Sequence, residues 1–160
     1  TFMNATRRIL LNALGLAAWL PLGARAGDTG KPRVEVWKSP TCGCCKAWVT
    51  HLRAEGFVVD DKVVHSLDAV RQALGTPDDL LSCHAGVVEG LALEGHVPAE
   101  AIRRLLAERP NGVRGLAVPD MPTGSPGMEV PGQQPDTYDV IAFGRLPHYR
   151  FMRFTGAGPV

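Results

Sequence analysis

Three of the four cysteines in this chain lie within four residues, in the run Cys42-Gly43-Cys44-Cys45, and the fourth is Cys83. Cys42 and Cys45 have the C-x-x-C spacing of thioredoxin-type redox motifs. A third thiol at position 44 would disturb a two-thiol redox cycle, because it could attack a disulfide formed by its neighbours. Three thiolates so close together are better suited to binding a soft metal ion.

Other soft ligands are present elsewhere in the chain. His84 follows Cys83 directly, His96 lies further along, and Met121 and Met128 occupy a segment without core periodicity. If these residues are not ligands, the histidines would be buried for structural reasons and the methionines would lie on the surface. Cysteines accompanied by Met and His favour Cu(I), and crowded thiolates favour several bridged ions. Zinc is the alternative metal, since four thiolates satisfy a tetrahedral site.

Two further interpretations of the cysteines remain open. The first is a thiol–disulfide oxidoreductase in which Cys42 is the nucleophile and Cys45 the resolving thiol. The second is purely structural, either a zinc site or two disulfides such as Cys42–Cys45 and Cys44–Cys83. An iron–sulfur cluster also takes four cysteines, but it is less expected outside the cytoplasm.

The cysteine motif is predicted to lie where a strand meets a helix. Residues 34–37 have the composition of a strand, and Pro40 followed by Thr41 marks a helix start. Apolar residues then recur with helical spacing at Cys45, Trp48, Val49 and Leu52. The unpaired N–H groups and positive end of a helix N-terminus lower a thiol pKa and favour the thiolate.

The rest of the chain predicts an α/β fold of the α+β sandwich type, with a mixed central sheet flanked by helices. The expected order after the first helix is strand 57–64, a short helix from Ser66 to Gly75, a hairpin over 85–93 and a helix from Pro98 to before Pro110. This is the element order of a thioredoxin-like fold. Residues 119–137, with five Pro and three Gly, form a long loop, and strands 138–143 and 149–154 follow it.

Cys83 precedes the third predicted strand, where thioredoxin-like folds place a cis-proline loop against the C-x-x-C motif. No proline stands beside Cys83 in this chain. If the placement holds, Cys83 should face Cys42 and Cys45 across the site.

The first 26 residues have the features of a cleaved signal peptide. Arg7 and Arg8 precede an apolar run over 9–22, and Ala24-Arg25-Ala26 supplies a small-x-small cleavage site. The paired arginines also fit a twin-arginine signal, so both export routes stay open. We expect a linker over 27–33, a single domain over 34–160 without a membrane span, and a periplasmic location.

Composition excludes several classes of protein. The 160 residues are 45% apolar and 21% charged, with net charge +1, which is ordinary for a globular chain and excludes disorder. The predicted signal holds three Arg and no acids, so the remainder has 14 basic and 16 acidic residues. This charge gives no reason to expect nucleic-acid binding.

Residues 34–154 resemble the CopG-type periplasmic copper proteins, through the stretches WKSPTCGCC, LLSCHAGVVEG, LEGHVPAEAIRRLL and GLAVPDMPTGSPGME. The resemblance implies a thioredoxin-like fold, a role in copper resistance and a Cu(I) cluster, and a copper oxidoreductase role has been proposed for the family. Interconversion of Cu(I) and Cu(II) at the site is our own hypothesis for this chain. It also implies that the cluster ligands are the four cysteines, Cys42, Cys44, Cys45 and Cys83. His96, Met121 and Met128 lie in family-like stretches and are carried over as additional candidate ligands. Copper ions and other periplasmic copper-handling proteins are the implied partners.

Overall fold

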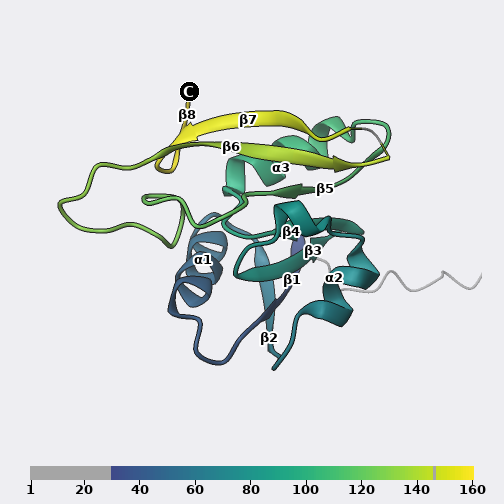
Figure 1. Ribbon diagram of the computed structural model, residues 1–160, viewed down its shortest axis with the longest axis horizontal. Coiled ribbons are helices and arrows are strands. Elements are labelled where there is room, and N and C mark those ends of the chain that lie inside the picture. The colour runs from purple at the N-terminus through teal and green to yellow at the C-terminus, as the bar shows by residue number, and fades with distance from the viewer. Residues whose placement is uncertain (1–29, 146) are drawn as a thin grey trace, which may run out of the picture.

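The computed structural model describes residues 30–145 and 147–160, so the predicted signal peptide and residues 27–29 of the predicted linker lie outside it. The described residues form one mixed sheet with three α-helices (Figure 1). The elements are β1 (Arg33–Lys38), α1 (Gly43–Ala54), β2 (Val58–Val63), α2 (Asp68–Leu74), the 3-10 turn η1 (Asp78–Leu80), β3 (His84–Val88), β4 (Leu91–Glu94), α3 (Ala99–Glu108), β5 (Val113–Ala117), β6 (Thr137–Gly144), β7 (Tyr149–Thr155) and β8 (Gly158–Pro159).

The eight strands lie in the order β2-β1-β3-β4-β5-β6-β7-β8. The pairs β1–β2 and β4–β5 are parallel, and all other neighbouring pairs are antiparallel. The predicted mixed α/β architecture is therefore confirmed at this level. Because strand side chains alternate between faces, the sheet buries two separate apolar surfaces.

Helices cover both faces of this sheet. On one face, Trp48 of α1 and Leu105 of α3 share a core with Val36 of β1 and Leu116 of β5. On the other face, η1 and α2 cover a smaller core formed by four buried side chains and two partly buried ones, Leu80, Ala92, Ala117, Phe143, Leu74 and Ile141. Helix α1 is thus held against the sheet with its first turn at the carboxyl end of β1.

Most of the predicted elements are present, and the structure adds two strands and the turn η1 that the sequence did not predict. The hairpin closes at Glu89 and Gly90, both with positive φ, and α2 ends at Gly75 in the left-handed region. The strands β5 and β8 were not predicted, so the expected order after α3 is corrected. Strand β5 is five residues long and buries three in succession, so it lacks the alternation that identifies half-buried strands.

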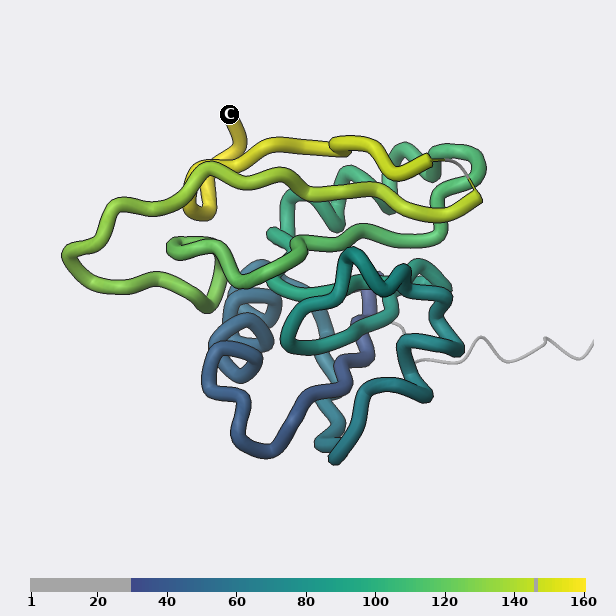
Figure 2. The backbone as a smooth tube through the Cα atoms, viewed as in Figure 1, coloured from purple at the N-terminus to yellow at the C-terminus, as the bar shows by residue number. Residues whose placement is uncertain are grey.

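The long loop before β6 packs back onto the first turn of α1. No described residue from 118 to 136 lies in a helix or strand, as expected for the segment. Figure 2 shows this segment, in green, running out from the sheet and returning beside α1. A Cβ on Gly127 would lie 2.6 Å from the backbone N of Trp48 and 2.9 Å from the carbonyl oxygen of Cys44. Only a glycine permits the loop to approach the helix this closely.

None of the helices within residues 30–145 and 147–160 has the length and apolar character needed to cross a membrane.

Candidate metal centre

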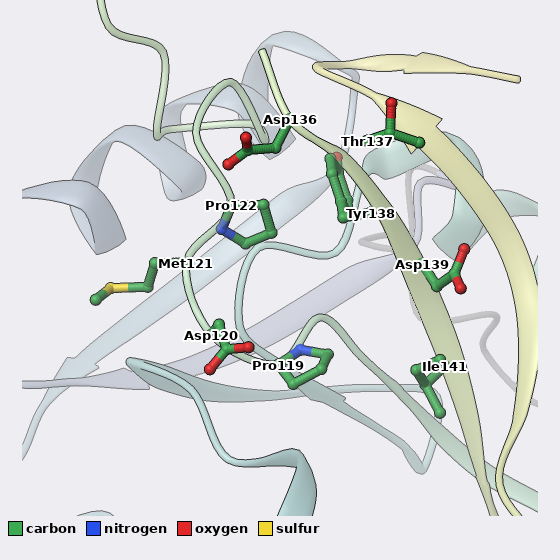
Figure 3. A pocket seen from close by; sticks show the side chains of 9 residues that line it. All are labelled: Pro119, Asp120, Met121, Pro122, Asp136, Thr137, Tyr138, Asp139 and Ile141. Atoms are coloured by element: carbon green, nitrogen blue, oxygen red, sulfur yellow. The ribbon is translucent and has the colours of Figure 1, made fainter.

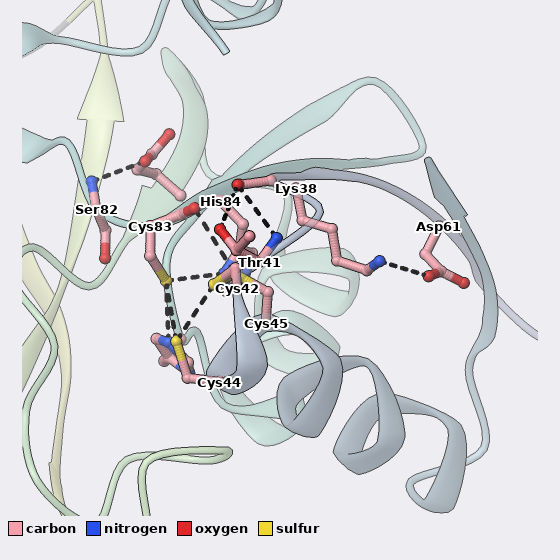
Figure 4. Close-up of a disulfide and its surroundings, with 12 residues drawn as sticks. Lys38, Thr41, Cys42, Cys44, Cys45, Asp61, Ser82, Cys83 and His84 are labelled. Carbon is pink, nitrogen blue, oxygen red and sulfur yellow. Dashed lines mark hydrogen bonds and ion pairs between the residues drawn. A yellow bond between two sulfur atoms is a disulfide. The ribbon is translucent and has the colours of Figure 1, made fainter. Parts of the chain in front are cut away.

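The cysteine motif occupies the first turn of α1. Cys42 is the N-cap residue, with extended backbone angles, and Cys44 and Cys45 lie within the first turn (Figure 4). This differs from the predicted start at Thr41 by two residues. No acidic side chain stands in this turn, so the positive end of the helix acts on the thiols without local compensation.

Cys83 reaches the same place from the loop between η1 and β3. Its Sγ lies 3.9 Å from Sγ of Cys44, which in turn lies 3.4 Å from Sγ of Cys42. Sγ of Cys45 lies 3.7 Å from the Cys83 carbonyl oxygen. All four sulfurs lie within 4.8 Å of one another, so residues from two distant segments form one group of soft donors.

The four cysteines are in two oxidation states in this structure. Cys42 and Cys45 form a disulfide, whereas Cys44 and Cys83 are free thiols (Figure 4). Thiolates, not disulfide sulfurs, are the effective ligands of soft metal ions. The full set of four donors therefore exists after two-electron reduction of the Cys42–Cys45 bond.

The Cys83 thiol is half-buried, and its surroundings favour the protonated form. Burial raises its pKa to about 12, and the neighbouring Cys44 adds to the rise. An isolated thiolate at this position would be poorly solvated. A bound cation would supply the missing compensation, and its binding would release the thiol proton.

Two buried imidazoles flank the Cys83 sulfur. Nδ1 of His84 and Nε2 of His96 each lie 3.1 Å from this Sγ, and both rings are fully buried. Cys83, His84 and His96 therefore form a second group of potential ligands that shares its sulfur with the first. Sulfur and imidazole together suit copper and zinc alike.

The long loop before β6 determines which ring nitrogen of His96 carries the hydrogen. Its Nδ1 lies 2.8 Å from the carbonyl oxygen of Pro126, which can only accept a hydrogen bond. In the neutral ring Nδ1 therefore carries the hydrogen, and Nε2 presents its lone pair to Cys83. Burial lowers the pKa of His96, which favours this neutral form.

His84 is held differently. Its ring packs against Trp48, with 4.3 Å between ring centroids, and its Nε2 is buried with no hydrogen-bond partner among the described residues. Burial, together with His96 and Arg71, lowers the pKa of His84 well below its usual value. Its Nδ1 lies 3.1 Å from the Cys83 sulfur, so this side of the ring faces the cysteine group.

The two candidate methionines lie on the long loop before β6. Met121 is 51% exposed and lies on the wall of an open pocket with Asp120 and Tyr138, where its side chain points away from the other lining residues (Figure 3). Met128 is partly buried one residue after Gly127, the point where the loop touches α1. Both methionines stay candidate ligands.

Sequence reasoning missed the residues that hold the Cys83 loop. Arg71 and Glu94 form an ion pair with 2.6 Å between Nη2 and Oε1, and both also bond to the backbone of Ser82. Glu94 ends a short apolar strand, and its side chain is fully buried. A lone acid in an apolar strand is the signal that would have identified it, since buried carboxylates require a partner.

Comparisons with known proteins identify relatives of this chain. A family model described as "Protein of unknown function, DUF411" matches residues 80–128, a segment that contains Cys83, both histidines and the two methionines. Two solved structures, titled "Copper resistance protein copG- Form 1" and "Form 2", are each 41% identical to the chain with a TM-score of 0.72. They cover 79% and 78% of this chain, and 100% and 98% of their own.

The chain belongs to the CopG family. This confirms the resemblance drawn from the cysteine stretches. No curated protein matches the chain. The titles of the two CopG structures associate those proteins with copper resistance, and the cysteine group described above offers this chain a set of donors suited to copper.

Proposed function

We propose that this CopG-family protein binds Cu(I) in the periplasm, in a thiolate cluster built by Cys42, Cys44, Cys45 and Cys83. The observation that carries the proposal is the convergence of the four sulfurs within 4.8 Å, from the start of α1 and from the loop before β3. Soft thiolates select Cu(I), and the related structures are named copper resistance proteins. The function is sequestration of copper for resistance or homeostasis.

More than one copper ion per chain is part of this proposal. Sγ of Cys44 has a sulfur neighbour on each side, at 3.4 Å and 3.9 Å. These separations suit one tetrahedral ion as well as a cluster, so the proposal of several ions rests on the crowding of three thiols in one short chain segment, which suits thiolates that bridge Cu(I) ions. The neighbouring imidazoles also suit Cu(II), so interconversion of Cu(I) and Cu(II) at the site belongs to the proposal.

A thioredoxin-like core is the fold that we propose for the first half of the domain. The strand order β2-β1-β3-β4, with β3 antiparallel to its neighbours, places the cysteine motif between β1 and α1. Strands β5–β8 then extend that sheet at the β4 edge. This arrangement supports the element order expected from the sequence.

The cluster is tested by titrating anaerobically reduced protein with Cu(I) in competition with a chromogenic chelator. We expect more than one Cu(I) per chain, and loss of much of this capacity in Cys83→Ser. A stoichiometry of one or below contradicts the cluster, and unchanged binding in the variant removes Cys83 from the site. Metal analysis of protein purified from the periplasm decides between copper and zinc.

A thiol–disulfide oxidoreductase is the second candidate, favoured by the Cys42–Cys45 disulfide at a helix N-terminus. The Cys42 thiolate would attack a substrate disulfide, forming a mixed disulfide and releasing one substrate thiolate. The Cys45 thiolate would then attack Cys42, closing the intramolecular disulfide and releasing the second thiolate. Insulin reduction that survives Cys44→Ala and Cys83→Ala favours this candidate over copper binding.

A structural zinc site predicts a different result, because loss of the metal would unfold the domain. Thermal unfolding with and without a chelator tests it.

Export is tested separately, by mass spectrometry of the mature protein from a periplasmic fraction. We expect a chain that begins at Gly27, and retention of residues 1–26 would contradict cleavage. Co-purification with copper-handling proteins of the same compartment would identify partners.

A further inference from the structure

The residue before Cys83 is held by three hydrogen bonds from three segments. The Ser82 N–H donates to Oε1 of Glu94 at 2.8 Å, and its carbonyl accepts from Nη2 of Arg71 at 2.6 Å. Its hydroxyl donates to the carbonyl oxygen of Asp120 at 2.5 Å. Every polar group of Ser82 is therefore used to fix the peptide that leads into Cys83.

Arg71 and Glu94 make this arrangement rigid through a two-point contact. Nε of Arg71 lies 3.2 Å from Oε2 of Glu94, while Nη2 serves both Oε1 and the Ser82 carbonyl. The planar guanidinium matches a carboxylate in this fork geometry, which a lysine cannot reproduce. The Glu94 side chain is 0% exposed and that of Arg71 15%, so solvent does not compete strongly for these bonds.

A buried ion pair needs an explanation beyond stability. Removing two charges from water carries a large desolvation penalty, and apolar replacements of such pairs are often equally stable. Such pairs are best attested where they fix one arrangement of the chain. Here the arrangement is that of the loop that carries Cys83. Cys83 is flanked by Ser82 and His84, so no adjacent proline restricts the backbone there.

We propose that Arg71 and Glu94 are positioning residues that hold the Cys83 sulfur between Cys44 and the two imidazoles. This inference rests on the proposed function, since it takes Cys83 as a copper ligand. Arg71 comes from α2 and Glu94 from the end of β4, so the pair connects both elements to the loop. Without it, the loop would sample conformations in which Cys83 leaves the cysteine group, and the thiolate set would be incomplete.

The first experiment asks whether the pair acts through Cys83. Cu(I) affinity is measured by chelator competition for Arg71→Lys in the wild-type and Cys83→Ser backgrounds. We expect a loss of about tenfold in the wild type and no further loss in the Cys83→Ser background, because coupled residues give non-additive effects. An equal loss in both backgrounds, or none in either, overturns the proposal.

The matched control is Arg153→Lys. Arg153 also makes a two-point contact, with Nε 2.6 Å and Nη2 3.0 Å from the carboxylate oxygens of Asp139, but on the exposed β6–β7 hairpin. It touches no part of the Cys83 loop, so we expect unchanged Cu(I) affinity. Glu94→Gln provides a second variant if Arg71→Lys does not fold, with the same expected coupling to Cys83.

A second experiment reads the loop without copper. In disulfide-bonded Cys44→Ser protein, Cys83 is left as the free thiol, and its alkylation by iodoacetamide is followed by mass spectrometry. We expect Arg71→Lys to accelerate alkylation severalfold and Arg153→Lys to leave it unchanged, since local opening exposes the half-buried sulfur. Equal alkylation rates with and without Arg71→Lys overturn the positioning role. If Arg71→Lys accelerates alkylation but the wild-type protein binds no Cu(I), only the proposed function is contradicted.

Discussion

Nε2 of His96 lies 3.1 Å from Sγ of Cys83, and the opposite nitrogen of the same ring donates to the Pro126 carbonyl. The long loop thereby determines which nitrogen faces the sulfur. We predict that His96→Gln lowers Cu(I) affinity about 10- to 100-fold, the range found when groups that complete or orient a metal site are lost. Chelator competition measures the change.

X-ray absorption at the copper edge adds a direct readout, because the nitrogen contribution should fall in His96→Gln. The control is His65→Gln, since His65 is exposed and lies two residues after the end of β2. Identical spectra for wild type and His96→Gln would show that this ring is not a ligand.

The close approach of the loop at Gly127 gives a second prediction. Gly127→Ala places a Cβ against the backbone of α1 and also forces alanine into φ +89°. We expect a loss of about 1–2 kcal/mol from the backbone angle, and a further loss of about 1–3 kcal/mol from overpacking. Urea unfolding measures the stability, and Cu(I) competition should show weaker binding.

Gly132→Ala is the matched control within the same loop. Gly132 has φ +79°, yet an added Cβ meets nothing within 4 Å. This variant should therefore show the cost of the backbone angle alone and retain Cu(I) affinity. Equal destabilisation by the two substitutions would mean that the contact with α1 is loose in solution.

The buried imidazoles predict an acid-sensitive fold. Burial lowers the pKa of both His84 and His96, so the unfolded chain binds more protons below about pH 6.5. In copper-free protein, the contribution of these two histidines to the free energy of unfolding is therefore fully present above that pH and is lost as the pH falls. The slope is at most about 1.4 kcal/mol per pH unit for each histidine.

Urea unfolding between pH 7.5 and 5 tests this dependence. His96→Gln should flatten the slope relative to the wild type, while the exposed His65→Gln should leave it unchanged. A wild-type stability that is level across this range would show that the two rings are solvated in the native protein.

The disulfide predicts a redox dependence of metal binding. Cys42 and Cys45 are joined in the structure, which leaves Cys44 and Cys83 as the free thiols. We expect oxidised protein to bind fewer Cu(I) ions than protein reduced with a non-metal-binding phosphine. Titrations of the two forms measure the difference, and equal stoichiometry would exclude Cys42 and Cys45 from the cluster.

Local sequence patterns were sufficient for much of the fold. Helix α1 follows from apolar spacing at Trp48 and Leu52, and the β3–β4 turn follows from Glu89-Gly90. Strand β5 was missed because it is short, largely buried and contains a glycine, Gly115, at its centre. Its identity depends on pairing with β4 and β6, which no local window contains.

The sequence by itself determined the donor chemistry of the site. The spacing of Cys42, Cys44 and Cys45 requires all three thiols at one chain segment, and their type selects soft metals or redox chemistry. It also determined that His84 adjoins Cys83. These are properties of neighbouring residues, which covalent geometry keeps together in any fold.

Only the tertiary structure decided how the distant parts meet. It brought Cys83 to the first turn of α1, aimed His96 at that sulfur through the Pro126 carbonyl, and anchored the loop through Arg71 and Glu94. Each of these contacts joins segments separated by many residues. They exist because the sheet order sets which strand ends and loops are adjacent, and that order is fixed by burial of the whole core.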